Sequence, residues 1–316
     1  MEYRVLGATG LLVSVLGFSG NDLGRDRRRD IAAETLRTIA AALDHGVTLF
    51  DTANSYVSGD SERMLGHALA GRRQDIVLCS KAGHGFWASL PAQRLVGPLN
   101  RRSSRNFRPS ALETAVAGSL RRLRTDRLDV LYLHNPPPRV VQDDDVLACV
   151  ERMKSKSYIR FWGISCAKIA SADDAHQAVG REGVAVVQIP ASCVQTLHTA
   201  ALAREAAARG VALVGRQPFG HGDLLTSQVQ PEWAASPVCT PARTALTYAS
   251  GSRGWLACRW ACAVTNICTK ASTPWRPLRD PPVVNEATTV AKLYHFDTDH
   301  DRLFRKASPT PSRAET

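Results

Sequence analysis

The feature that most constrains the fold is a repeated alternation between short apolar runs and longer segments of helical period. In the segment 31–44, for instance, Leu36, Ile39 and Leu43 fall on one face of a helix. The short runs are almost continuously apolar, which is typical of strands covered on both faces in a parallel sheet. The pattern predicts helices over residues 31–44, 61–70, 109–123, 143–154, 172–179, 199–209 and 241–249, and strands over residues 47–50, 75–79, 128–133, 159–164, 185–188 and 211–214.

Repeated β-α units of this length predict an α/β fold, namely a (β/α)8 TIM barrel, after a hairpin over residues 3–17. A doubly wound open sheet is the alternative. The polar residues favour the barrel, because the active-site residues of a TIM barrel lie at the C-terminal ends of its strands. No G-x-G-x-x-G pattern follows the first strand, as a dinucleotide-binding open sheet would require. The polar residues at the strand ends are Asp51, Lys81, His134, Ser165 and Gln188.

The pattern weakens near the C-terminus. A helix over 241–249 should lead to an eighth apolar strand, but residues 250–316 are rich in Cys, Trp, Pro and Thr and have little helical period. We therefore divide the chain into a barrel over residues 1–249 and an atypical segment, irregular or disordered, over residues 250–316. The barrel is expected to be incomplete or irregular at its eighth strand and helix. Two explanations stay open: an idiosyncratic extension, and a change of coding frame that replaced the natural end.

Composition narrows the classes of partner. The formal net charge of +11 suits several kinds of phosphate-bearing partner. However, the basic clusters at 25–29 and 101–105 lack the interleaved aromatic residues of a nucleic-acid platform. The eight cysteines lack paired metal-ligand spacing, and the apolar run at 11–16 is too short for a secretory core or a membrane span. We expect a cytoplasmic protein with free thiols and with no metal, nucleic-acid or membrane partner; its oligomeric state stays open.

Four of the polar residues suit proton transfer to a carbonyl group. The phenol of Tyr56 is a poor acid at an ordinary pKa of about 10, but a neighbouring ammonium stabilises the phenolate and lowers that pKa. Lys81 would supply this charge, and Asp51 would hold Lys81 in an ion pair. His134 would hydrogen-bond the substrate carbonyl and direct it toward the phenol. Each residue alone also has an ordinary structural explanation, so the hypothesis depends on their shared position at strand ends.

Several segments resemble the aldo-keto reductase family. They are residues 7–14, Asp51 to Tyr56 with Gly59, Ser61, Glu62 and Leu65-Gly66, residues 80–83, residues 128–134 and residues 163–165. The resemblance implies a TIM barrel that binds NADP(H) in extended form and reduces aldehydes or ketones by hydride transfer. It also implies that Tyr56 is the general acid, that Lys81 and Asp51 tune it, and that His134 orients the carbonyl.

The resemblance further implies a cofactor site. The family holds the nicotinamide carboxamide with a Ser-Asn pair and a Gln; Ser165 and Gln188 match, whereas Cys166 stands where Asn is usual, and a thiol is a weak donor and acceptor. Arg216 would stack its guanidinium on the nicotinamide, the alternative being a solvated loop charge. The implied cofactor-binding residues are Gly20, Asn21, Asp51, Ser165, Cys166, Gln188, Arg216, Gln217, Pro218, Phe219, Gly220 and Gly222.

One part of the family pattern is missing. Members bind the adenosine 2′-phosphate after the eighth strand, and here only Lys270-Ala271-Ser272 weakly matches that pattern. We therefore keep two hypotheses: an NADP(H)-dependent oxidoreductase for a small carbonyl substrate, and a catalytically impaired barrel that binds a cofactor or a protein partner. The sequence does not identify the carbonyl substrate.

Overall fold

The computed structural model describes residues 1–21, 23, 29–84, 105–166, 172–191, 199–218 and 256–261. The chain divides into two units, Met1–Pro281 and Pro282–Thr316, and every described residue belongs to the first. The strands are β1 (Tyr3–Val5), β2 (Leu12–Ser14), β3 (Leu16–Ser19), β4 (Leu49–Asp51), β5 (Val77–Ala82), β6 (Leu128–His134), β7 (Ile159–Ser165), β8 (Val186–Pro190), β9 (Ala212–Arg216) and β10 (Leu256–Ala261). The helices are α1 (Arg29–Asp44), α2 (Asp60–Ala68), α3 (Pro109–Leu123), α4 (Pro138–Val141), α5 (Asp144–Ser155), α6 (Ala172–Gly180) and α7 (Thr199–Ala208), with 3-10 turns η1 (Gly7–Thr9), η2 (Tyr56–Gly59) and η3 (Arg73–Asp75).

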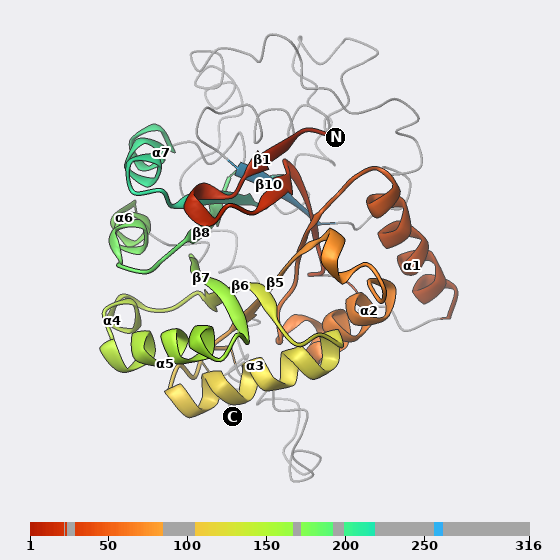
Figure 1. Ribbon diagram of the computed structural model, residues 1–316, viewed down its shortest axis with the longest axis horizontal. Coiled ribbons are helices and arrows are strands. Elements are labelled where there is room, and N and C mark those ends of the chain that lie inside the picture. Colours follow the sequence, from red (N-terminus) through yellow and green to blue (C-terminus); the bar gives the residue numbers. More distant parts are fainter. Residues whose placement is uncertain are drawn as a thin grey trace, which may run out of the picture. The chain divides into compact units, whose positions relative to one another are not determined.

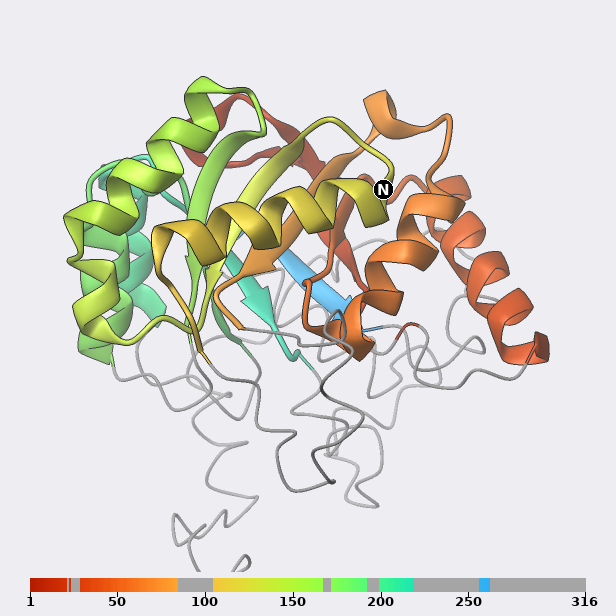
Figure 2. The same ribbon diagram turned by 90° about the horizontal axis from the view of Figure 1, so that it is seen from below.

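Parallel strands close into a barrel in the order β10-β3-β4-β5-β6-β7-β8-β9. The described helices lie outside these strands and follow one another around them from α1 to α7 (Figure 1). Figure 2 shows the same arrangement from below, with α3 crossing in front of the strands. The predicted TIM barrel is therefore confirmed, and the open sheet is not formed. Within the described residues, no helix is long and apolar enough to cross a membrane.

Strand β10 closes the barrel, pairing in parallel with β3 on one side and with β9 on the other. On the β9 side its register shifts between Leu256 and Cys258. The eighth strand is thus present but irregular. The boundary predicted near residue 250 stays a prediction, because residues 219–255 and 262–316, including the predicted helix over 241–249, lie outside the described residues.

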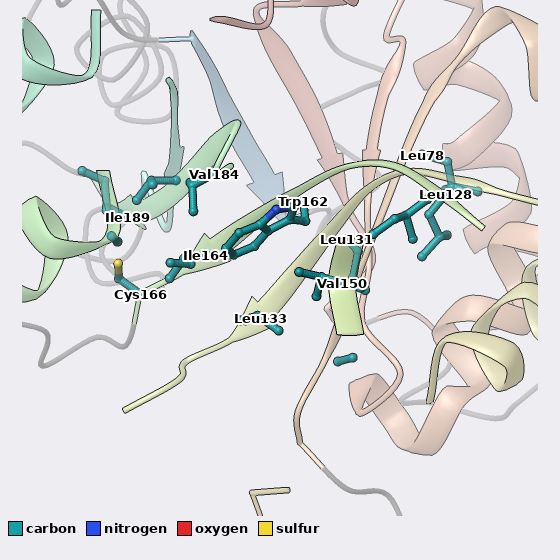
Figure 3. Packing of buried hydrophobic residues seen from close by; sticks show 14 of the residues in the cluster. Leu78, Leu128, Leu131, Leu133, Val150, Trp162, Ile164, Cys166, Val184 and Ile189 are labelled. Atoms are coloured by element: carbon teal, nitrogen blue, oxygen red, sulfur yellow. The ribbon is translucent and has the colours of Figure 1, made fainter. Parts of the chain in front are cut away.

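The core has two layers because successive strand residues point to opposite faces. On β6, Leu131 and Leu133 pack outward against the helices, whereas Val130 and Tyr132 pack into the barrel interior. Figure 3 shows part of the outer layer, where strand residues such as Trp162 lie among aliphatic side chains. Each fully buried aliphatic side chain contributes about 1.5–3 kcal/mol of transfer free energy. The alternation between the two layers determines whether the side chains near the end of each strand point into the barrel or toward the helices.

The N-terminal hairpin closes one end of the interior. Strands β1 and β2 pair antiparallel, and Leu6, Leu11 and Val13 join the same buried cluster as the inward residues of the barrel strands. The amide of Ala8 donates to the carbonyl of Gly210, just before β9, at 2.8 Å. The hairpin therefore covers the end of the barrel at which the strands begin. The polar residues that end the strands lie at the opposite end.

Candidate functional site

Six consecutive barrel strands end in polar side chains on the inner face. On β5, Val77 and Cys79 belong to the interior cluster, so Lys81 is the next side chain on that face. The same alternation operates on the other strands, and the register places His134 beside Ser165 and Ser165 beside Gln188. The six residues are Asp51 on β4, Lys81 on β5, His134 on β6, Ser165 on β7, Gln188 on β8 and Arg216 on β9.

Lys81 and Asp51 form a buried ion pair. The Lys81 Nζ lies 2.6 Å from Asp51 Oδ2 and also donates to the backbone carbonyl of Thr52 at 2.6 Å. Lys81 and Asp51 are only 1% and 3% exposed. Taking two charges out of water is costly unless they are paired and hydrogen-bonded, so this geometry fixes the ammonium at one point. The structure thus contains the ion pair that was predicted between these two residues.

Tyr56 lies beside this ammonium. The Lys81 Nζ is 4.8 Å from the centroid of the Tyr56 ring, and Tyr56 meets the His134 ring edge-on, with 5.9 Å between centroids. The next two residues, Val57 and Ser58, have φ of 47° and 54°, although neither is glycine. A β-branched residue in this region is strained, and such strain costs about 1–3 kcal/mol per residue and clusters at functional sites. The backbone is thus bent immediately after the phenol.

His134 contacts side chains from two other segments of the chain, one with Ser55 and Tyr56 and one with His84. It is 9% exposed, and its Nδ1 lies 3.5 Å from the hydroxyl of Ser55. The His84 ring stacks on it with 4.4 Å between centroids and an interplanar angle of 30°. Together with the edge-on Tyr56 ring, these contacts bring all four predicted catalytic side chains into one cluster. Within the described ranges, no group of three His, Cys, Asp or Glu is arranged to hold a metal.

A second set of polar groups lies across the barrel end on β7 to β9. The Ser165 hydroxyl donates to Gln188 Oε1 at 3.0 Å. This bond fixes the orientation of the Gln188 amide group. The Arg216 guanidinium donates to the backbone carbonyl of Cys166 at 2.8 Å. A hydroxyl, an amide and a planar cation are the groups that suit a neutral carboxamide and an aromatic ring.

Cys166 itself points the other way. It follows Ser165 directly, so its side chain lies on the outer face, among the apolar residues between strands and helices (Figure 3). Only its backbone carbonyl contacts Arg216. This packing does not favour a ligand contact through the thiol, and it explains why a Cys is tolerated at this position.

The remaining predicted cofactor residues are placed unevenly. The Gly20 amide donates to the Asp51 carbonyl at 2.8 Å, and the Gly20 carbonyl accepts from Ser61 Oγ at 2.6 Å. Asn21 follows directly, and its amide donates to Ser19 Oγ at 3.4 Å. Gln217 and Pro218 follow β9, Gln217 with a φ of 59°. The predicted residues outside the described ones are Phe219, Gly220 and Gly222.

The family model described as "Aldo/keto reductase family" matches residues 15–272. The chain belongs to the aldo/keto reductase family. A curated relative, a probable voltage-gated potassium channel subunit beta of Arabidopsis thaliana, is 32% identical over 173 residues, which cover 52% of this chain and 46% of that protein. The chain spans about half the length of this and similar curated relatives.

Solved structures share the fold with this family member. An aldo-keto reductase AKR11C1 from Bacillus halodurans, in a holo form, superposes with a TM-score of 0.74 at 23% identity, covering 93% of this chain and 96% of that one. An aldo/keto reductase from Klebsiella pneumoniae, in complex with NADP and acetate, has a TM-score of 0.70 at 20% identity and the same coverage of 93% and 96%. At these identities the likeness concerns the barrel.

Two members of the cluster were not predicted as site residues. His84 lies three residues beyond Lys81, and Asn54 lies inside the segment Asp51 to Tyr56. The Asn54 Nδ2 donates to the His84 carbonyl at 3.1 Å, and Asn54 is 4% exposed. The only sequence signal for either residue is closeness to a strand end, so their contacts emerge only in the folded chain.

We expect the Cys166 thiol to resist alkylation in the folded protein. Burial raises its pKa to about 12, although the nearby Arg216 charge opposes the shift. A pKa of about 12 leaves roughly one thiol in 10⁴ ionised at pH 8, and the thiolate is the reactive form. Peptide mass spectrometry after iodoacetamide treatment at pH 8 should find Cys166 unmodified in folded protein and modified in denaturant. Rapid modification without denaturant would contradict the placement of the thiol.

Proposed function

We propose that this chain is an NADP(H)-dependent oxidoreductase that reduces an aldehyde or ketone to an alcohol, with Tyr56 as the general acid. The observation that carries the proposal is the buried Lys81 ammonium, ion-paired to Asp51 at 2.6 Å and 4.8 Å from the Tyr56 ring centroid. A cation at this position stabilises the phenolate that remains after the phenol gives up its proton.

The residues of the cluster divide the work on the carbonyl. NADPH, when bound, supplies the hydride. Tyr56 donates its hydroxyl proton to the carbonyl oxygen, while the charge of Lys81 stabilises the developing phenolate. Asp51 keeps that ammonium in place. His134, braced by the Ser55 hydroxyl and two aromatic rings, hydrogen-bonds the carbonyl oxygen and aligns it with the phenol.

The polar groups on β7 to β9 support NADP(H) as the cofactor. Ser165 and Gln188, hydrogen-bonded to each other, would hold the nicotinamide carboxamide, and Arg216, anchored on the Cys166 carbonyl, would stack on the ring. Solved relatives of the same fold are described in complex with NADP or NADPH, which supports this assignment. The free Cys79, Cys149 and Cys166 thiols fit a reducing, cytoplasmic location.

A second candidate function has one specific observation in its favour. The similarity to a probable potassium channel subunit beta favours a barrel that binds the cofactor and serves a protein partner with little turnover of its own. Such a barrel would keep the same Lys81–Asp51 pair and the same cofactor contacts. The two functions therefore differ in catalytic rate and not in cofactor affinity.

The experiment measures both NADPH binding and NADPH oxidation on purified full-length protein. A reductase is expected to quench or shift NADPH fluorescence with micromolar affinity or better, and to oxidise NADPH when aldehydes and ketones from a panel are added. Tight NADPH binding without turnover of any member of the panel would favour the second candidate. Failure to bind NADPH at all would contradict both.

A further inference from the structure

Two imidazoles stack on each other at the ends of β5 and β6. His84 and His134 are 4.4 Å apart between ring centroids and nearly parallel. The His84 ring also hydrogen-bonds the backbone of His134. His84 therefore contacts the proposed carbonyl-orienting residue twice, once through its ring face and once through its polar edge.

The backbone around His84 is held by several partners. Gly83 has a φ of 109°, and a Cβ there would lie 2.0 Å from the Phe107 ring, so only glycine fits. The Gly83 carbonyl accepts from the Asn106 amide at 2.8 Å, and the Asn54 side chain donates to the His84 carbonyl at 3.1 Å. His84 also forms an antiparallel bridge with Arg105. The chain is thus turned and fixed at the one place from which this ring reaches His134.

The surroundings of the His84 ring favour its uncharged form. Burial and the charge of Arg105 lower its pKa, and the hydrogen bond to the His134 backbone opposes this only in part. The lowered pKa of His84 is consistent with the stacking, which is established by the ring geometry.

We propose that His84 is a positioning residue, which holds the His134 imidazole by stacking and so fixes the direction of the carbonyl that Tyr56 protonates. The proposal rests on the proposed reductase function and names an additional residue on which its rate depends. A misplacement of a reacting group by about 1 Å can cost about 10²-fold in rate.

Three variants separate the ring from the hydrogen bond. His84→Ala removes both, His84→Phe keeps a ring of similar width, and His84→Gln keeps a hydrogen-bonding edge without the ring. We expect kcat to fall by about 10- to 10²-fold in His84→Ala and His84→Gln, with most of the rate retained in His84→Phe. NADPH affinity is expected to stay unchanged in all three. His45→Ala, at the exposed end of α1, is the matched histidine control and should leave kcat unchanged.

A measurement without turnover tests the contact itself. The ring signals of His134 in 1H–15N spectra, assigned by their loss in His134→Gln, should shift in His84→Ala and stay in place in His45→Ala. If wild-type protein oxidises no NADPH, the reductase proposal fails, whereas a shift still supports the stacking contact. Unmoved His134 signals, or a His84→Gln variant that outperforms His84→Phe, would overturn the positioning role.

Discussion

Replacement of Tyr56 with Phe is expected to lower carbonyl turnover by about 10²- to 10⁴-fold or more, because the reaction loses its proton donor. The Phe ring can keep the contacts that Tyr56 makes with the Lys81 ammonium and with the edge of His134. The substitution therefore removes an oxygen atom and leaves the shape of the cluster. The measurement is NADPH oxidation under saturating substrate, with kcat and KM determined separately.

The control for this prediction is Tyr158→Phe. Tyr158 is 45% exposed and precedes β7, so loss of its hydroxyl should leave turnover unchanged. NADPH binding by fluorescence should be equal in wild type and both variants, since the proposed cofactor contacts lie on β7 to β9. A Tyr56→Phe variant with undiminished kcat would remove Tyr56 from the mechanism and leave the Lys81–Asp51 pair without its proposed role.

The periodic part of the chain could be predicted closely. Residues 109–123 were predicted as a helix and form α3 (Pro109–Leu123), because Pro suits the first helical turn and apolar residues recur on one face. Strand β3 (Leu16–Ser19) was missed as a separate element. Only Val15 separates it from β2, so no turn signal divides the hairpin from the first barrel strand. The four-residue helix α4 is too short for a period to be recognised.

Strand β10 shows where pattern reading fails. It contains Arg259 and Trp260 and lacks the apolar run of the other strands, yet it pairs on both sides within the barrel. Backbone pairing to two neighbours decides its conformation, whereas local composition points to an irregular segment. The expectation of an incomplete or irregular eighth strand came from side chains, and closure depends on main-chain hydrogen bonds.

The candidate site was predictable to the extent that it follows from strand parity. Asp51, Lys81 and His134 end neighbouring strands on the inner face, and the sequence shows this directly. The same parity argument would have placed the Cys166 side chain on the outer face. The His84 contact could not be predicted, because it joins residues 50 positions apart through a turn at Gly83. Tertiary contacts of this kind leave no periodic signal.

The second large effect is expected in stability, when Arg122 is replaced with Ala. Glu62 on α2 is 0% exposed; its Oε1 accepts from Ser80 Oγ of β5 at 2.6 Å and its Oε2 accepts from Arg122 Nε of α3 at 2.6 Å. The side chain of Arg122 is itself only 15% exposed. Removing one partner of a buried pair leaves an uncompensated charge and costs about 3–5 kcal/mol.

The backbone cannot relax to relieve that charge. A Cβ on Gly66, one turn beyond Glu62, would lie 2.5 Å from the Arg122 carbonyl, so α2 and α3 are in close backbone contact at this point. The two helices therefore cannot move closer together to fill the space that the guanidinium leaves. At about 1.5 °C per kcal/mol for a chain of this size, the midpoint of thermal unfolding should fall by roughly 5–8 °C in Arg122→Ala.

Two further variants decide whether charge burial is the cause of this loss. Arg152→Ala breaks an ion pair to Glu113 whose side chains are 51% and 44% exposed, and it should cost less than about 1 kcal/mol. Adding Glu62→Gln to Arg122→Ala should recover part of the lost stability, because a neutral amide is cheaper to bury than a carboxylate. If Arg122→Ala melts with the wild type, or if the double variant melts lower still, the buried pair does not hold α2, β5 and α3 together.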